Sequence, residues 1–278
     1  MLRIITDTGS DVTYLGAPAL GMESVELGVQ FEDFSYDYRN DTDFSVFYEA
    51  LAKAKNLPTT SQVTPGQYLD LFEDAKAKGD EVLVVTISSE ISGTYQSAIM
   101  AQEMSGYEGI SVVDSHLASV GQRMLAEYAV RLREAGKGRL EIAEALEQVK
   151  SQVVFGVLMD SLKYLKKGGR VSPAMGILGE LLHVKPTVTM REGKIVTLGK
   201  ARGTESAKQV LWNQFEADGY DESWPVYFGY TYNKEMGEAF MQETKEKFGL
   251  TECILCSVGG VIGTHGGPNN VAIGYKKK

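Results

Sequence analysis

Residues 81–98 read EVLVVTISSEISGTYQSA. The run Val82–Ile87 is almost wholly β-branched or apolar, which is typical of a parallel-sheet strand that is buried on both faces. The small hydroxyl residues after it predict a loop at the carboxyl end of the strand, with Ser92 as the N-cap of a helix. This one stretch therefore predicts an α/β fold.

The same stretch predicts a ligand site. Gly93 has no side chain, so the backbone amides of Gly93, Thr94 and Tyr95 can point at a group that lies above the strand. A helix N-terminus of this kind favours an anion. The alternative is an ordinary strand-loop-helix turn in which Ser92 only caps the helix.

The first half of the chain alternates between strands and helices. We expect strands at residues 2–7, 25–30, 82–87 and 110–114, and helices at 43–55, 65–78, from 92 onward, at 122–134 and at 140–150. Strands that alternate with helices pair in parallel through right-handed crossovers. The polar cluster Asp7–Asp11 follows the first strand, at the sheet edge where open α/β sheets bind ligands.

The second half adds antiparallel pairing. We expect strands at 153–158, 185–190, 194–198, 226–230, 252–257 and 271–275, and helices at 161–167, from about 173 to 182, at 204–217 and at 235–248. A turn at Arg191–Gly193 predicts a hairpin, and residues 259–268 predict a glycine-rich loop around His265. The prediction is two α/β domains, residues 1–151 with a parallel sheet flanked by helices and 152–278 with a mixed sheet and helices, and a ligand between them.

Composition and charge exclude several classes of function. The net charge is −9, and residues 1–150 carry 12 Lys and Arg against 24 Asp and Glu, which argues against nucleic-acid binding. Residues 151–278 carry 16 basic residues against 13 acidic ones, and ten of the basic residues lie between Lys163 and Lys208. That stretch is either a solvated face or a docking patch for a phosphorylated ligand or an acidic partner.

Localisation and cysteine usage complete this picture. No apolar run approaches the roughly 18 residues of a membrane span, and the chain opens on a strand rather than a signal peptide, so we expect a cytoplasmic protein. Cys253 and Cys256 lie on opposite faces of a predicted strand, so neither a disulfide nor a shared metal site is expected, and we expect no metal site elsewhere.

Several motifs resemble those of one known family in both order and spacing. They are Thr6–Asp11, Pro58–Gln62, Ser88–Ser97, Val113–Ser115, Gly168–Arg170, Lys185–Pro186 and Gly263–His265. Over essentially its whole length the chain is similar to the DegV family. It departs from the family pattern at Gly9, Val63, Gly266 and Asn269, and these changes leave the motif residues that hold a carboxylate in place.

The resemblance implies a lipid carrier rather than an enzyme. Family members hold a long-chain fatty acid between two α/β domains and present its carboxylate to a separate fatty acid kinase catalytic subunit. The acyl phosphate then passes to an acyltransferase of phospholipid synthesis, a role that is compatible with transient membrane contact. No cofactor other than the bound fatty acid is implied.

The resemblance also implies roles for particular residues. It places the carboxylate at Thr60 and Ser92, with Thr59, Ser61, the Gly93 amide and His265 around it. It places contacts with the kinase at Arg170 and Arg202. The protonation state of His265 is open, because a neutral ring can donate one hydrogen bond and a charged ring adds attraction.

A Ser-His-Asp acyl ester hydrolase is the alternative function. Ser92, His265 and either Asp7 or Asp114 could supply a nucleophile, a base and an orienting carboxylate. The chain has no Gly-x-Ser-x-Gly elbow, and a serine at a helix N-cap is usually bonded to the backbone. A kinase acting alone is disfavoured, because residues 193–201 lack the spacing and the Ser/Thr of a phosphate loop.

Overall fold

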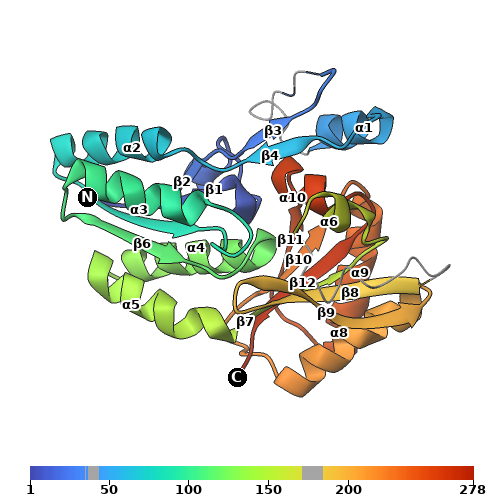
Figure 1. Cartoon of the computed structure of the whole chain (residues 1–278). Coiled ribbons are helices and arrows are strands. Elements are labelled where there is room, and N and C mark those ends of the chain that lie inside the picture. The colour runs from blue at the N-terminus through green and yellow to red at the C-terminus, as the bar shows by residue number, and fades with distance from the viewer. Residues whose placement is uncertain (35, 37–43, 171–183) are drawn as a thin grey trace.

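The computed structural model describes residues 1–34, 36, 44–170 and 184–278. They form two main sheets, one from each half of the chain, with helices around and between them (Figure 1). The predicted α/β class, with a parallel sheet first and a mixed sheet second, is confirmed. The helix expected from about 173 to 182 lies outside the described residues.

The N-terminal sheet is wholly parallel. Its strand order is β2 (Glu23–Val25), β1 (Leu2–Asp7), β5 (Glu81–Thr86), β6 (Ile110–Asp114). Val82 and Val84 of β5 pack in one core cluster with Tyr68 and Ala98, and the alternate side chains of the strand pack in another. Both faces of β5 are therefore buried, as its unbroken apolar run predicts.

Four helices cover this sheet. They are α2 (Pro65–Lys78) and α3 (Thr94–Ser105) on one face, and α4 (Ser119–Glu134) and α5 (Arg139–Val149) on the other (Figure 1). Helix α2 begins with a capping box formed by Thr64 and Gln67, and it ends at Gly79, whose φ is 70°. The helix expected from Ser92 begins two residues later, with Gly93 as its N-cap.

The C-terminal sheet is mixed. Its order is β11 (Cys253–Ser257), β10 (Val226–Tyr230), β12 (Val271–Lys276), β7 (Val153–Leu158), β8 (Val184–Arg191), β9 (Lys194–Arg202). Only β10 and β11 pair in parallel, and β8 and β9 form the predicted hairpin. Helices α8 (Thr204–Asp218) and α9 (Lys234–Phe248) pack on one face of this sheet.

Helix α4 lies between the two sheets. Its Val120 and Met124 share one core cluster with Leu83 of the first sheet and with Phe155 and Tyr227 of the second. The two halves therefore have a common hydrophobic core as well as a separate one each. The division of the chain into domains at residue 151 stays a prediction.

The remaining short elements correct three expectations. They are η1 (Thr8–Ser10), η2 (Ala17–Leu20), β3 (Gly28–Gln30), α1 (Ser45–Lys53), β4 (Thr59–Ser61), η3 (Lys150–Gln152), α6 (Lys163–Lys167) and α10 (Gly260–Gly266). The single strand expected at 25–30 is two strands in different sheets, and the loop expected at 58–62 contains β4, which pairs with β3. The glycine-rich loop expected at 259–268 contains the helix α10.

The cysteines lie on strand β11, as the sequence predicts. Cys253 and Cys256 are both free, and they pack in different core clusters on opposite faces of the sheet. Within the described residues, no helix is both long and apolar enough to cross a membrane.

Candidate ligand-binding site

A cavity of about 360 Å³ lies between the two halves of the molecule. Residues from the loop after β5 and from β4 line it on the N-terminal side, and residues from β7, β8, β9 and α10 line it on the C-terminal side. This volume lies within the ordinary range of small-molecule sites. The cavity therefore occupies the place where the sequence predicts a ligand.

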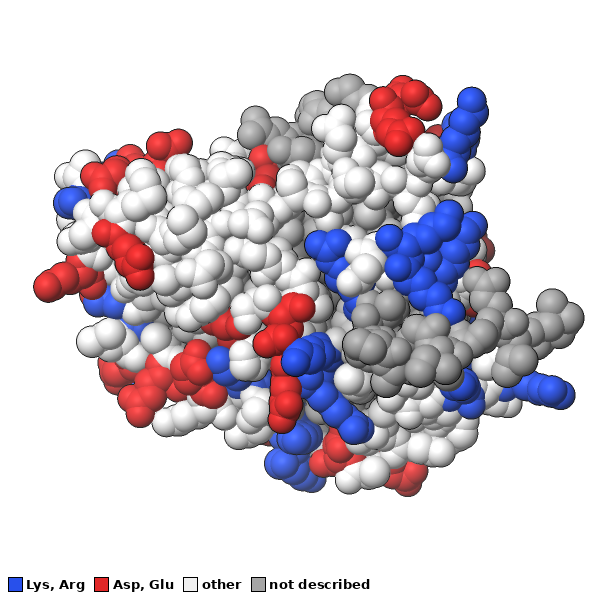
Figure 2. Space-filling view, in the orientation of Figure 1, with Lys and Arg blue, Asp and Glu red and all other residues white. Residues whose placement is uncertain are grey.

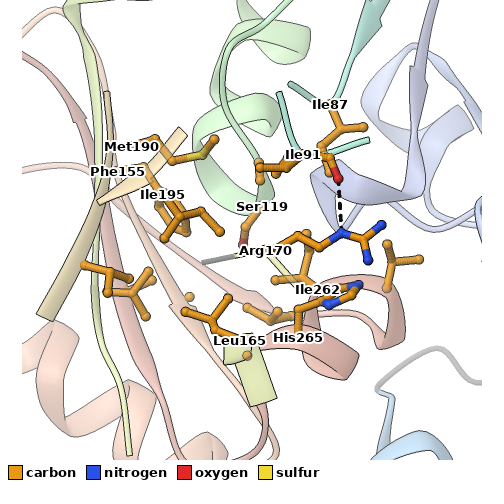
Figure 3. A pocket seen from close by; sticks show the side chains of 18 of the residues that line it. Ile87, Ile91, Ser119, Phe155, Leu165, Arg170, Met190, Ile195, Ile262 and His265 are labelled. Atoms are coloured by element: carbon orange, nitrogen blue, oxygen red, sulfur yellow. Dashed lines mark hydrogen bonds between the residues drawn. The ribbon is translucent and has the colours of Figure 1, made fainter. Parts of the chain in front are cut away.

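Most of the cavity wall is apolar. The lining side chains without a polar group include Leu27, Ile87, Ile91, Phe155, Val157, Met159, Leu165, Val188, Met190, Ile195, Val258, Val261 and Ile262. Met190, Phe155 and Ile195 lie at one end of the cavity, whereas Arg170 and His265 lie at the other (Figure 3). The site is thus apolar at one end and polar at the other.

A hydrogen bond between Thr60 and His265 joins the two halves at the polar end. Thr60 Oγ1 and His265 Nε2 are 2.9 Å apart, and they come from β4 and α10. The other ring nitrogen, Nδ1, is buried and has no hydrogen-bond partner. A buried acceptor without a partner is tolerated better than a buried N–H, so we assign the tautomer in which Nε2–H donates to Thr60.

Burial keeps His265 neutral. The pKa of His265 is lowered from 6.5 to about 4, first by burial and then by the positive charge of Arg170. The Thr60 hydroxyl accepts from the ring, so its own hydrogen is available to a ligand oxygen. A neutral histidine can orient such a hydroxyl, whereas the positive charge at this end of the cavity comes from Arg170.

Gly168 makes room for the imidazole. A Cβ at position 168 would lie 2.1 Å from His265 Nδ1. Helix α6 ends here, and the Gly168 carbonyl oxygen accepts a 2.7 Å hydrogen bond from Arg170 Nη1. The Gly168–Arg170 motif therefore places a guanidinium beside the imidazole.

Ser92 and Gly93 lie at the start of α3 and line the cavity. Ser92 Oγ is 2.9 Å from Thr94 Oγ1 and accepts a 3.3 Å hydrogen bond from the Thr94 amide. The Thr94 amide is therefore not directed at a ligand, contrary to the prediction. A Cβ at Gly93 would lie 2.0 Å from Gln62 Oε1. Gln62 thus packs over Gly93, and its Nε2 donates to Ser97 Oγ at 2.8 Å.

The structure brings most of the predicted site residues together. Thr60, Ser61, Ser92, Gly93, Arg170 and His265 all line the cavity. Thr59 is exposed on β4 and is not among the lining residues, and Arg202 is exposed at the end of β9. Arg170, expected to contact a kinase, lies in the cavity wall, where Nε donates to the Ile91 carbonyl oxygen at 3.3 Å (Figure 3).

The groups of the alternative hydrolase triad make other contacts. His265 bonds Thr60, and Ser92 bonds Thr94. The Asp7 carboxylate accepts from the amides of Gly9 and Ile87. Asp114 accepts from the amides of Ser89 and His116. These contacts of Ser92, His265, Asp7 and Asp114 do not connect a serine, a histidine and an aspartate in the order that nucleophilic catalysis needs.

Several lining residues were missed by sequence reasoning. Gln62, Ser119, Thr231 and Asn270 are polar lining residues, and each is bonded to a neighbouring segment. The apolar lining on β7 consists of alternate residues of the strand, a period-2 signal that the sequence does contain. Among the described residues, no group of three or more His, Cys, Asp or Glu could hold a metal ion.

Known proteins resemble the whole chain. The family model described as "Uncharacterised protein, DegV family" matches residues 1–278. A DegV domain-containing protein of Caldanaerobacter subterraneus is 30% identical over 278 residues, which is 100% of this chain and 99% of the relative. A fatty-acid-binding DegV family protein of Thermus thermophilus has a TM-score of 0.87, with 29% identity and 100% and 99% of the two chains covered. A stearic acid-binding protein of Eubacterium ventriosum has a TM-score of 0.86, with 27% identity and the same coverage.

Proposed function

Because this chain belongs to the DegV family, we propose that it binds a long-chain fatty acid in the cavity between its two sheets and presents the carboxylate to a separate kinase. The observation that carries the proposal is the polarity of the cavity, which has apolar walls and one polar end. A fatty acid has the same polarity, and it is the ligand of the Thermus thermophilus and Eubacterium ventriosum relatives.

The two ends of the ligand would contribute differently to binding. Burial of the acyl chain is worth roughly 0.8 kcal/mol per CH₂ group, so the tail supplies most of the affinity. The carboxylate would accept hydrogen bonds from the hydroxyls of Thr60 and Ser92, each worth about 1.5–3 kcal/mol for a charged acceptor. The head group therefore fixes the direction of the ligand, with its carboxylate beside Arg170.

Presentation to a kinase is the further step of the proposal. Exposed basic side chains lie on α6 and β9, among them Lys163, Lys167, Lys200 and Arg202. Figure 2 shows Lys and Arg gathered on the C-terminal half of the face in view. A positive surface near the polar end of the cavity would attract an acidic partner or a phosphoryl group. We expect a non-catalytic carrier of the cytoplasm, which passes the acyl phosphate to an acyltransferase.

The first experiment is native mass spectrometry of the purified protein, followed by extraction of any bound lipid. The proposal predicts a co-purified fatty acid, or a mass shift when C16 to C18 acids are added. A protein that carries no lipid and does not shift with these acids would overturn the proposal. Turnover of acyl esters that is lost in Ser92→Ala would instead establish the hydrolase.

Substitution then tests the head-group contacts. We expect the double variant Thr60→Ala, Ser92→Ala to bind fatty acid at least about tenfold more weakly, because two hydrogen bonds to the carboxylate are lost. The control is Ser151→Ala, Thr251→Ala, which removes two exposed hydroxyls outside the cavity. Equal affinities for the two double variants would contradict the assignment. Phosphorylation by a kinase preparation, compared between the wild type and Arg202→Ala, tests the presentation step, because Arg202 is exposed and lies outside the cavity lining.

A further inference from the structure

Helix α10 belongs to the C-terminal half, where it packs against α6, but it is also in contact with the N-terminal half. There it packs against η1, α1, β3 and β4, and it carries His265 to Thr60 on β4. The helix has only seven residues, so a shift at its first turn carries through to His265 in its last turn. The position of the imidazole therefore depends on what fixes the start of α10.

Asp11 fixes that start. Its Oδ1 accepts a 2.8 Å hydrogen bond from the backbone N–H of Gly259, the N-cap residue of α10. Its Oδ2 accepts a hydrogen bond from the hydroxyl of Ser119, the first residue of α4. Asp11 is only 5% exposed and has a φ of 60°, a conformation that favours glycine, asparagine and aspartate. One carboxylate thus joins η1, α4 and α10.

Burial of the Asp11 carboxylate disfavours its charged form. Burial raises the pKa of Asp11 to about 7, and the hydrogen bonds from Ser119 and Gly259 only partly offset this effect. Tyr48 supports the same segment, because its hydroxyl donates to the Val258 carbonyl oxygen at 2.9 Å. The cluster Asp7–Asp11, which the sequence suggests as ligand contacts, therefore supplies a support for α10 instead.

We propose that Asp11 is a positioning residue for the head-group site, and that it acts by fixing α10 so that His265 meets Thr60. The inference rests on the proposed binding of a fatty acid, but it concerns a residue outside the groups that touch the carboxylate. It predicts that loss of the Asp11 contact weakens the recognition of the head group and leaves the binding of the tail nearly unchanged.

The test compares two ligands with the same tail. Palmitate and hexadecanol are measured by competition against a fluorescent fatty acid, and the ratio of their affinities reports the head group alone. Asp11→Gly fits the positive φ and removes the contact, and we expect the ratio to fall about fivefold to tenfold. Asp11→Asn can accept from Gly259 through its oxygen and donate to Ser119 through its amide, so we expect it to keep the ratio.

The control variant is Ser24→Ala. Ser24 Oγ donates to the Val12 carbonyl oxygen at 2.7 Å, so it supports the same loop without touching α10. A loss of stability alone would lower both affinities in every variant and leave the ratio unchanged. Asp11→Glu, whose carboxylate is displaced by one CH₂ group, should lower the ratio as Asp11→Gly does, and it serves if the glycine variant fails to fold.

The ring nitrogens of His265 give a second measurement that needs no ligand. Their NMR shifts, assigned with His265→Gln, should change in Asp11→Gly or Asp11→Glu and stay near the wild-type values in Asp11→Asn and Ser24→Ala. A folded Asp11→Gly or Asp11→Glu variant with unchanged His265 shifts and an unchanged ratio of palmitate to hexadecanol affinity would overturn the inference. An Asp11→Asn variant in which this ratio falls as in Asp11→Gly would also overturn it. If the wild type binds neither ligand, the proposed function fails, while the ring shifts still decide the role of Asp11.

Discussion

His265 is a neutral histidine whose two ring nitrogens have different surroundings. Nε2 contacts Thr60 in the cavity, and Nδ1 faces the backbone of Gly168. The ring therefore orients a hydroxyl and adds no charge, while Arg170 supplies the charge. The orientation of the ring therefore depends on its close contacts with Thr60 and Gly168.

Gly168→Ala tests the contact with Gly168. The added Cβ would lie 2.1 Å from His265 Nδ1, so the ring must move and lose its contact with Thr60. We expect fatty acid affinity to fall about tenfold, because the Thr60 hydroxyl, which we propose to face the carboxylate, loses its orientation. Gly66→Ala, in the first turn of α2 with no atom nearer than 4.0 Å, is the matched control in a binding titration. Equal affinities in the two variants would contradict this assignment.

The lowered pKa of His265 has a consequence for stability. Between pH 4 and 6.5 the unfolded chain binds a proton that the folded histidine does not, so the contribution of His265 to the free energy of unfolding rises with pH in this window. The slope is at most about 1.4 kcal/mol per pH unit. We expect the free energy of unfolding of His265→Gln, from urea denaturation at a series of pH values, to have a less positive slope against pH than that of the wild type. Equal slopes for the wild type and the variant would show that the ring is not buried in its neutral form.

Asp11 gives the opposite slope. Its pKa in the folded protein, about 7, lies above its value in the unfolded chain, so the folded state holds the extra proton between about pH 4 and 7. The contribution of Asp11 to the free energy of unfolding therefore falls as pH rises through this range. The stability of Asp11→Asn should fall less steeply with pH than that of the wild type, and equal slopes for the two proteins would refute this.

The hairpin of β8 and β9 is the element that closes the far side of the cavity. It contributes Met190 and Ile195 to the lining, and its turn touches the loop after β5. Ser88 Oγ donates to the Gly193 carbonyl oxygen at 2.8 Å, and Lys194 Nζ lies 3.4 Å from a Glu90 carboxylate oxygen. The hairpin thus links the two halves at the loop that also carries Ser92.

Gly193→Ala tests this link. Gly193 has a φ of 77°, and an added Cβ would lie 2.6 Å from Ser88 Oγ. Gly79→Ala is the matched control, because Gly79 has a φ of 70° and no atom within 4 Å. We expect the control to lose about 1–2 kcal/mol of stability and Gly193→Ala to lose about 1–3 kcal/mol more, measured by denaturant unfolding. Equal losses of stability in the two variants would mean that the turn at Gly193 does not pack against Ser88.

At the scale of the whole molecule, the shared core joins the two sheets into one unit. The cluster around α4 contains residues of both sheets, among them Leu83 and Tyr227. We therefore expect a single unfolding transition, although chains above about 150 residues often unfold in steps. The only tryptophans, Trp212 and Trp224, lie in the C-terminal half, so tryptophan fluorescence reports the unfolding of that half, whereas far-UV circular dichroism reports the whole chain. If the molecule unfolds as one unit, the two signals should have the same midpoint. Separate midpoints would show that the halves unfold independently.

Much of this architecture is predictable from the sequence, and the part that is not has physical reasons. Buried strands such as β5 and capped helices such as α2 carry local signals. Helix α10 does not, because three of its seven residues are glycines, as in a loop, and its stability comes from contacts such as that of Asp11 with Gly259. The place of Arg170 in the cavity wall, and of Thr59 outside it, also depends on contacts between distant segments that no local pattern records.

The cavity walls come from both halves, so an acyl chain that fills the cavity would extend the contacts between them. A ligand that binds only the folded protein stabilises it, by about 2.7 kcal/mol at a free concentration one hundred times Kd. Proteases degrade the unfolded fraction, and that fraction shrinks as occupancy rises. The amount of this protein that survives in a cell should therefore follow the supply of its lipid.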